Sequence, residues 1–296
     1  MSVLNYYTTQ DIQVLTKKHL YIVFIQGGEA MPKVITITKG GVAKTTTTIN
    51  LGVGLARHRK KVLLVDCNMQ ADLTSCFLGE DEIQSTLADA MIQTMGGSPI
   101  EKLDFIHPTE EGVDVIPAEK ALIGVESQLV TALSRESILR RFLEQVQEGY
   151  DYVLLDCPAG LSQIVINAMV ASDGVIIPTE PGADSFSGVY GAVENVRKIK
   201  NLLNPSLDVT GILITKADLR TNLHRRFALQ IKEMFGPSVP VFRQIIPDRI
   251  AVGNSKESRK SIFAYDAKSD AAIAYDNLTK EVLSLDAPIK KQSRTR

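Results

Sequence analysis

The sequence predicts an α/β protein built on a single doubly wound, mostly parallel sheet with helices on both faces. Short, near-continuous apolar runs alternate with longer segments whose apolar residues recur at helical spacing. Strands that are apolar along their whole length are typical of a parallel sheet that is covered on both faces. A glycine-bearing turn between the first strand and the first helix places a candidate ligand site at the carboxyl ends of the strands.

The expected elements follow one another along most of the chain. Apolar runs of strand length predict strands at 34–37, 61–66, 103–106, 113–116, 152–156, 174–177, 209–214 and 241–246. Helical periodicity predicts helices at 45–58, 86–92, 119–148, 187–203, 221–235 and 269–285. Residues 67–84 are expected to form a loop, and Gly236 is expected to stop the helix before it.

Length and composition set the domain organisation. A chain of 296 residues with 44% hydrophobic and 23% charged residues suits one large globular α/β domain, which we place at residues 31–286. Residues 1–30 are interpreted as an N-terminal extension. Met31, directly before the first strand, is an alternative start that N-terminal sequencing of native protein would identify. Residues 287–296 are expected to form a basic, disordered tail.

Charge and cysteine content exclude several functional classes. The net charge of −1 provides no global basic field, so any nucleic-acid site must be a local patch. Three cysteines without a CxxC pattern suit a reducing cytosol, and four scattered histidines show no zinc-site spacing. No apolar run approaches the ~20 residues of a membrane span, and the last residues have no apolar face for a membrane surface.

The segment from Lys39 to Thr46 has the layout of a phosphate-binding loop. It lies between a predicted strand and a predicted helix, where backbone N–H groups and the helix N-terminus favour an anion. Lys44 is expected to contact the β- and γ-phosphates, and the Thr45 hydroxyl to ligate Mg²⁺. The residues expected to bind nucleotide are Lys39, Gly40, Gly41, Val42, Ala43, Lys44, Thr45 and Thr46.

This loop departs from the plain P-loop pattern, which requires glycine at positions 38 and 43, where this chain has Thr38 and Ala43. The remaining Lys-Gly-Gly-x-x-Lys-Thr-Thr resembles the deviant Walker A motif of the ParA/MinD family of P-loop ATPases, closest to the Soj-like ParA proteins. If position 43 needs a positive φ, alanine there costs about 1 kcal/mol.

The resemblance covers about residues 32–286 and implies a P-loop NTPase fold with ATP and Mg²⁺ as cofactors. It also implies a homodimer that forms with ATP, in which Lys39 crosses to the phosphates of the partner subunit. The family's further partners are nonspecific DNA and a ParB-like protein that stimulates hydrolysis. The implied location is cytoplasmic and nucleoid-associated, with no membrane association.

Two predicted strands end in aspartates, Asp66 and Asp156, which are candidate Mg²⁺ ligands together with Thr45. Asp156 corresponds to a Walker B aspartate. The segment after Asp66 resembles the family motif Asp-x-Asp-Pro-Gln-Gly, but its second, catalytic aspartate falls on Asn68. An amide cannot act as a base, so hydrolysis is expected to be slow, while Asp72 is an alternative source of a carboxylate.

Later motifs concern the base and DNA. Thr215-Lys216-Ala217-Asp218 matches the Thr-Lys-x-Asp form of a guanine-reading motif, so GTP is an alternative nucleotide. The family's DNA-binding arginines match Arg220 and, less closely, Arg249. Arg225 and Arg226 lie off the apolar stripe of the helix expected at 221–235 and extend the candidate DNA-binding set.

The sequence therefore predicts an ATP-dependent dimerising switch that binds DNA nonspecifically and acts in chromosome or plasmid partition. Lys39, Lys44 and Asn68 are its candidate catalytic positions. One alternative is an ATP-bound DNA-binding scaffold with little or no turnover, which Asn68 favours. A second alternative is a GTP-binding switch.

Overall fold

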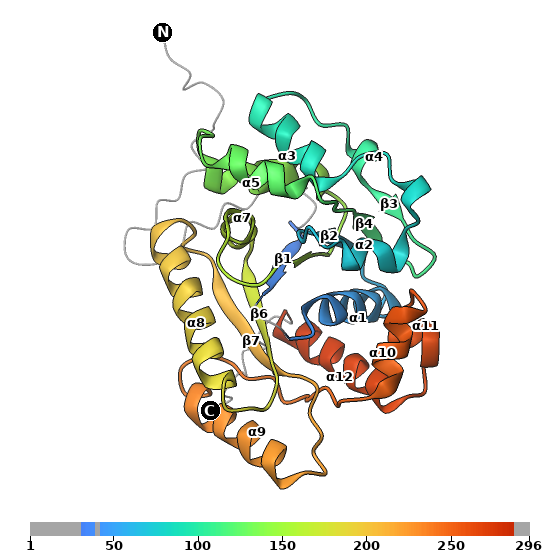
Figure 1. Cartoon of the computed structure of the whole chain (residues 1–296), viewed down its shortest axis with the longest axis vertical. Helices are drawn as coiled ribbons and strands as arrows, with labels where there is room; N and C mark the ends of the chain where they lie inside the picture. Colours follow the sequence, from blue (N-terminus) through green and yellow to red (C-terminus); the bar gives the residue numbers. More distant parts are fainter. Residues whose placement is uncertain (1–30, 39–41, 287–296) are drawn as a thin grey trace, which may run out of the picture. The chain divides into compact units, whose positions relative to one another are not determined.

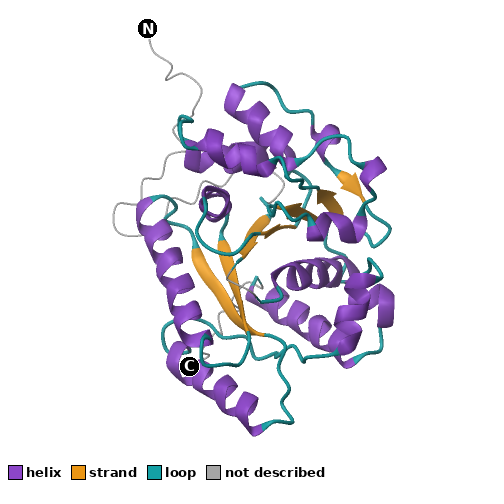
Figure 2. Cartoon of the chain, viewed as in Figure 1, coloured by secondary structure: helices purple, strands orange, loops and turns teal. Residues whose placement is uncertain are grey.

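The computed structural model describes residues 31–38 and 42–286. Their strands form one seven-stranded sheet in the order β3-β4-β2-β5-β1-β6-β7, in which only the short β3 runs antiparallel to its neighbour. Figure 2 shows this sheet enclosed between helices. The strands are β1 (Lys33–Ile37), β2 (Val62–Asp66), β3 (His107–Pro108), β4 (Asp114–Ile116), β5 (Tyr152–Asp156), β6 (Gly174–Thr179) and β7 (Asp208–Ile214).

Helices cover both faces of the sheet, as the sequence predicts. They are α1 (Lys44–Arg57), α2 (Asp72–Phe77), α3 (Leu87–Gly96), α4 (Lys102–Phe105), α5 (Leu122–Leu129), α6 (Ile138–Val146), α7 (Gln163–Ala171), α8 (Ser185–Leu202), α9 (Asn222–Phe235), α10 (Ile250–Glu257), α11 (Ile262–Asp266) and α12 (Asp270–Leu285). Figure 1 shows α1, α10, α11 and α12 gathered on one side of the sheet, away from α3, α5, α7 and α8.

Alternate residues of the central strands pack into two separate hydrophobic cores. Leu63 and Val65 face the core made with α3, α5, α6, α7 and α8, whereas Val62 and Leu64 face the core made with α1, α2, α11 and α12. This alternation follows from the two-residue period of a strand. Because both faces are buried, the strands read as continuous apolar runs, and the α/β fold class is confirmed.

The sheet register brings the functional strand ends together. Asp156 at the end of β5 lies opposite Ile37 at the end of β1, and opposite Asp66 at the end of β2. The loop after β1 therefore begins beside two buried carboxylates. Helix α1 can pack closely on α12 because Gly54 has no side chain, and a Cβ there would lie 2.2 Å from Thr279 Oγ1.

Two predicted strands are wrong. Residues 103–106 belong mainly to helix α4, where Phe105 is buried and Leu103 is exposed, a pattern that a four-residue run cannot assign to strand or helix. Residues 241–246 run beside β7 but make only an isolated bridge, between Val241 and Ile212. Their regular pairing is interrupted because the backbone N–H groups of Arg243 and Gln244 donate to the Glu281 carboxylate of α12.

Several helices also differ from the predictions. The helix expected at 119–148 is divided into α5 and α6 around Ser134, which has a left-handed backbone with φ 51°. The expected loop at 67–84 contains α2. Helix α7 was not predicted because it is apolar on nearly all sides and so lacks a clear period. Helices α10 and α11 were also not predicted, since both are short.

Candidate nucleotide-binding site

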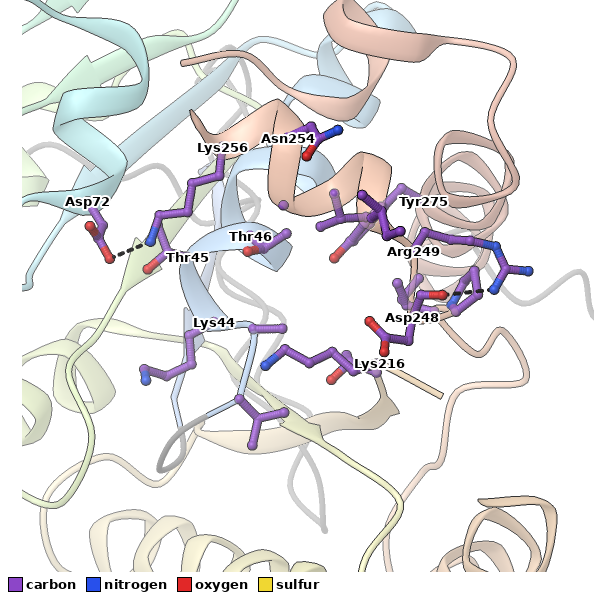
Figure 3. A pocket seen from close by; sticks show the side chains of 18 of the residues that line it. Lys44, Thr45, Thr46, Asp72, Lys216, Asp248, Arg249, Asn254, Lys256 and Tyr275 are labelled. Carbon is purple, nitrogen blue, oxygen red and sulfur yellow. Dashed lines mark hydrogen bonds and ion pairs between the residues drawn. The ribbon is translucent and has the colours of Figure 1, made fainter. Parts of the chain in front are cut away.

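A pocket of about 790 Å³ opens at the carboxyl ends of the strands. One wall is the start of α1, with Val42, Ala43, Lys44, Thr45 and Thr46, and the opposite wall is α10 and the segment before it (Figure 3). Asn68, Gln70 and Asp72 from the β2–α2 connection line a third side. Residues 42–46 of the predicted P-loop therefore line this pocket, while Lys39, Gly40 and Gly41 lie outside the described residues.

Ala43 has the left-handed backbone that the sequence analysis considered for this position. Its φ is 42° and its ψ 27°, and it is the residue from which α1 begins. The carbonyl of Ala43 accepts the first helical hydrogen bond, from Thr47 N at 2.9 Å. Because only glycine adopts this conformation without steric cost, the loop carries strain where the plain P-loop pattern has glycine.

Thr45 and Asp156 are in direct contact. The Thr45 hydroxyl donates to Asp156 Oδ2 at 2.6 Å, and the Thr48 hydroxyl lies 3.4 Å from Asp156 Oδ1. Asp156 is fully buried, and this burial, together with the nearby Asp66 carboxylate, raises its pKa well above the usual range. A buried carboxylate beside a hydroxyl provides hard oxygen atoms for a divalent cation, and a cation there would relieve the unfavourable charge.

Asp66 occupies a different kind of environment. Its carboxylate accepts hydrogen bonds from Asn68 N at 3.0 Å, from Thr74 N at 3.0 Å and from Thr74 Oγ1 at 2.8 Å. These bonds hold the β2–α2 connection in its fold. Asp66 is thus tied to this connection, whereas Asp156 contacts the Thr45 hydroxyl, so the geometry favours Asp156 over Asp66 as a direct contact for Mg²⁺.

Asn68 lies where the resemblance places a catalytic aspartate. It lines the pocket, although only 9% of the residue is exposed. Its side-chain oxygen accepts from Gln70 N at 3.2 Å, which makes a short turn within the loop. The described residues contain no group of three or more His, Cys, Asp or Glu that could hold a metal ion. A metal here would therefore depend on ligand oxygens as well as on the protein.

The predicted DNA-binding arginines are only partly brought together. Arg220 and Arg249 line the pocket, where Arg220 binds Asp218, and Arg249 lies 3.0 Å from Asp270. Arg225 and Arg226 lie on α9. Arg225 contacts Asn222, and the Arg226 guanidinium lies 5.9 Å from the centre of the Phe227 ring. Neither lines the pocket in the described part of the chain.

Two lysines that line this pocket were not predicted to meet there, since Lys216 was considered only as part of the guanine-reading motif and Lys256 had no predicted role. Lys216, at φ 48°, pairs with Glu180 at 2.7 Å, and Lys256 pairs with Asp72 at 3.0 Å. Both lysines extend into the pocket from different elements (Figure 3). The positive charge of these side chains was visible in the sequence, but their convergence depends on α10, which was not predicted.

No helix in the described ranges is both long and apolar enough to span a membrane.

The site defines the class of P-loop nucleotide-binding proteins. It combines β1, a phosphate-binding loop and α1 with a buried aspartate, Asp156, at the end of the neighbouring strand β5. The family model described as an AAA domain matches residues 32–209. The chain is 38% identical to the sporulation initiation inhibitor protein Soj of Bacillus subtilis over 256 residues, which is 85% of this chain and 98% of Soj. It is 35% identical to the chromosome partitioning protein ParA of Caulobacter vibrioides, over 83% of this chain and 91% of that protein.

A solved structure agrees with these relatives. The septum site-determining protein MinD from Pyrococcus horikoshii, complexed with Mg-ADP, superposes with a TM-score of 0.70 at 25% identity, covering 87% of this chain and 98% of MinD. This chain belongs to the ParA/MinD family of P-loop ATPases.

Proposed function

We propose that this chain is an ATP-dependent switch that dimerises with ATP, binds DNA without sequence preference and acts in chromosome or plasmid partition. The observation that carries the proposal is the pocket that Lys44 and Thr45 of the P-loop line together with Arg220 and Arg249. The relatives Soj and ParA support a role in partition, since the ParA of Caulobacter vibrioides is a chromosome partitioning protein.

The nucleotide is ATP held with Mg²⁺. Its phosphates lie against the N-terminal backbone of α1 and the Lys44 ammonium, both of which favour anions. Thr45 and Asp156 fit Mg²⁺ because they supply two hard oxygen ligands in contact with each other. When bound, the ion neutralises charge on the β- and γ-phosphates. Asp66 supports the β2–α2 connection behind this site.

Dimerisation depends on Lys39, which lies outside the described residues. A single-subunit P-loop has no need of this lysine, and a positive group arriving from a second subunit stabilises the transferred phosphoryl group. We therefore assign Lys39 to the phosphates of the partner subunit in an ATP-dependent homodimer. A ParB-like protein is the partner that stimulates hydrolysis and release.

We expect DNA to contact a small set of basic side chains, and the dimer provides two copies of this set. The chain has a net charge of −1, so the contacts come from a local set of basic side chains, Arg220, Arg225, Arg226 and Arg249. Arg225 and Arg226 lie on α9, which packs beside α8 through the ring contact between Phe227 and Phe186 at 6.0 Å. Phosphate contacts of this kind give an affinity for DNA that is independent of sequence and dependent on salt. This affinity would keep the protein on the nucleoid in the cytoplasm.

Hydrolysis is slow because Asn68 carries an amide where the family carries the catalytic carboxylate. The amide oxygen is bound to Gln70 N, and its nitrogen can only donate. The same observation favours a second candidate function, an ATP-bound DNA-binding scaffold with little or no turnover.

Size-exclusion chromatography and DNA binding, each measured with ADP, ATP and a non-hydrolysable ATP analogue, test the proposal. The switch predicts a dimer that binds DNA with ATP or the analogue, and a monomer with weak DNA binding with ADP. An ATP-bound dimer that remains on DNA for hours supports the scaffold. If nucleotide changes neither oligomeric state nor DNA binding, both functions are wrong. Lys39→Ala should abolish the dimer, and the monomeric variant should still bind nucleotide.

A further inference from the structure

An ion pair joins two elements across the mouth of the nucleotide pocket. Asp72 is the first residue of α2 and Lys256 lies near the end of α10, and Lys256 Nζ is 3.0 Å from Asp72 Oδ2. Both residues line the pocket that contains Lys44 and Thr45. The pair is partly exposed, with 39% of the Asp72 side chain and 54% of the Lys256 side chain accessible. The Asp72 carboxylate is therefore open to a ligand or to water in the pocket.

Asp72 differs from the other acidic side chains near the P-loop. Asp66 and Asp156 are fully buried, and each accepts hydrogen bonds through both of its oxygens. Lys256 binds only Oδ2 of Asp72, and no donor from the described ranges binds its Oδ1. Asp72 thus has a carboxylate oxygen available to a water molecule, which the two buried aspartates lack.

The position of Asp72 also separates it from the other acids that line the pocket. Figure 3 places Asp72 on the side of Thr45, whereas Asp248 lies on the side of Lys216 and Tyr275. Glu257 belongs to the α10 wall. The phosphate end of a bound nucleotide lies by Thr45 at the start of α1, so Asp72 is the exposed acid nearest that end.

We propose that Asp72, held by Lys256, orients the attacking water in this chain and takes over the task for which Asn68 has no carboxylate. This inference rests on the proposed function and concerns its hydrolytic step. Asp72 Oδ1 accepts a hydrogen bond from the water, while Lys256 keeps the carboxylate turned toward the pocket. Asp72 contacts the reacting water and is the catalytic residue of this step, whereas Lys256 is the positioning residue that holds it. The slow turnover of this chain depends on Asp72.

The step balances without any further reactant. The water oxygen forms a bond to the γ-phosphorus as the bond from that phosphorus to the β–γ bridging oxygen breaks, and ADP leaves with the bonding electron pair. One water proton passes by way of the Asp72 carboxylate to the released phosphate. Asp72 ends the cycle in its starting form.

Two measurements on the full chain separate orientation of water from binding. Single-turnover hydrolysis of MgATP gives the rate of the chemical step, and calorimetry with a non-hydrolysable analogue gives the affinity. Asp72→Asn should lower the rate by about tenfold or more, a typical effect of losing a positioned proton acceptor, and leave the dissociation constant within about twofold. Asp72→Ser should give the same result, which would exclude a folding defect of the single variant Asp72→Asn as the cause.

A second carboxylate provides a rescue test. In the Asn68→Asp background the new carboxylate orients the water, so adding Asp72→Asn should change the rate by less than about twofold. Lys256→Met should slow hydrolysis, and the double variant Asp72→Asn/Lys256→Met should be no slower than Asp72→Asn alone, because both act through one carboxylate.

Asp208→Asn is the matched control. Asp208 pairs with Lys200 at 2.8 Å and begins β7, so it lies at the amino ends of the parallel strands, whereas the P-loop follows the carboxyl end of β1. Its loss should therefore change neither measurement. The inference is overturned if Asp72→Asn hydrolyses ATP as fast as the unaltered chain, or if affinity falls as much as the rate. It is also overturned if the unaltered chain does not hydrolyse ATP while Asn68→Asp does. If the unaltered chain binds no analogue, the proposed function fails as well.

Discussion

The Arg220 guanidinium binds both carboxylate oxygens of Asp218, with Nε 2.8 Å from Oδ1 and Nη2 3.0 Å from Oδ2. The backbone N–H of Arg220 also donates to Oδ1, at 3.1 Å. This pairing fixes the turn between β7 and α9 and lowers the pKa of Asp218 to about 2. The Arg220 side chain nevertheless remains 85% exposed. This ion pair therefore bears on both the DNA-binding and the base-reading hypotheses.

The exposed Arg220 should contribute directly to DNA binding. Arg220→Ala is expected to weaken binding of random-sequence duplex DNA by the ATP-bound protein about five- to tenfold. It should also lower the slope of log affinity against log salt by roughly one for each phosphate that is no longer neutralised. Arg197→Ala on α8, where the exposed guanidinium pairs with Glu194 at 2.8 Å, is the control and should change neither value. An unaltered salt slope in Arg220→Ala would remove this residue from the DNA interface.

Asp218 should have no part in choosing the base. Its carboxylate is bound to Arg220, and Asp218 is not among the described residues that line the pocket, so it is poorly placed to accept from guanine. Asp218→Asn is expected to leave the ratio of ATP to GTP affinity within about twofold, as measured by competition between the nucleotides. A selective loss of GTP affinity by tenfold or more would restore the GTP-binding alternative.

The strained Ala43 predicts a variant that is more stable and binds nucleotide more tightly. Ala43→Gly removes the Cβ from a left-handed residue and should raise the free energy of unfolding by about 1 kcal/mol. It should also tighten MgATP binding, because the loop no longer has to be held against this strain. Chemical denaturation and calorimetry measure the two effects.

Ala71 supplies a matched control for this substitution. It has a similar left-handed backbone, φ 53°, at the start of α2, but it is not a described lining residue of the pocket. Ala71→Gly should therefore raise stability without changing nucleotide affinity. If both variants tighten binding equally, the effect of Ala43→Gly comes from general stability and not from the loop.

The sequence was sufficient to predict much of the sheet and the site because local patterns encode them. The apolar runs that end in Asp66 and Asp156 identify two central strands and place both carboxylates at the same edge. The motif likewise places Thr45 at the start of α1, and its contact with Asp156 then follows from sheet order.

Contacts between distant segments could not be predicted in this way. Lys256 and Asp72 are 184 residues apart, and their pairing depends on the fold of α10. The strand predicted at 241–246 failed because the Glu281 carboxylate, on a helix near the end of the chain, binds the backbone that a strand neighbour would use. Local propensity contains neither of these relationships.

Asn68 should limit the rate of ATP hydrolysis. Asn68→Asp restores a carboxylate beside the P-loop and is expected to raise the single-turnover rate by roughly tenfold or more, with little change in MgATP affinity. Asn254→Asp adds an acid on the opposite wall of the same pocket and serves as the control, since it should not accelerate hydrolysis. Equal single-turnover rates for the unaltered chain and Asn68→Asp would sink the idea that this amide slows the chemistry.

Asp156 should destabilise the nucleotide-free protein but contribute to Mg²⁺-dependent nucleotide binding. It is fully buried beside Asp66, and its raised pKa reports that the folded protein disfavours the charged form. Asp156→Asn keeps an oxygen that can accept from Thr45 and removes a carboxyl whose ionisation the fold opposes, so it should raise the free energy of unfolding without nucleotide by roughly 1–2 kcal/mol. The same variant should lose most of the Mg²⁺ dependence of nucleotide binding, because the amide oxygen is a weaker ligand. Denaturation without nucleotide and calorimetry with and without Mg²⁺ measure the two effects, and a destabilised variant would mean that Asp156 is a structural carboxylate whose hydrogen bonds outweigh its charge.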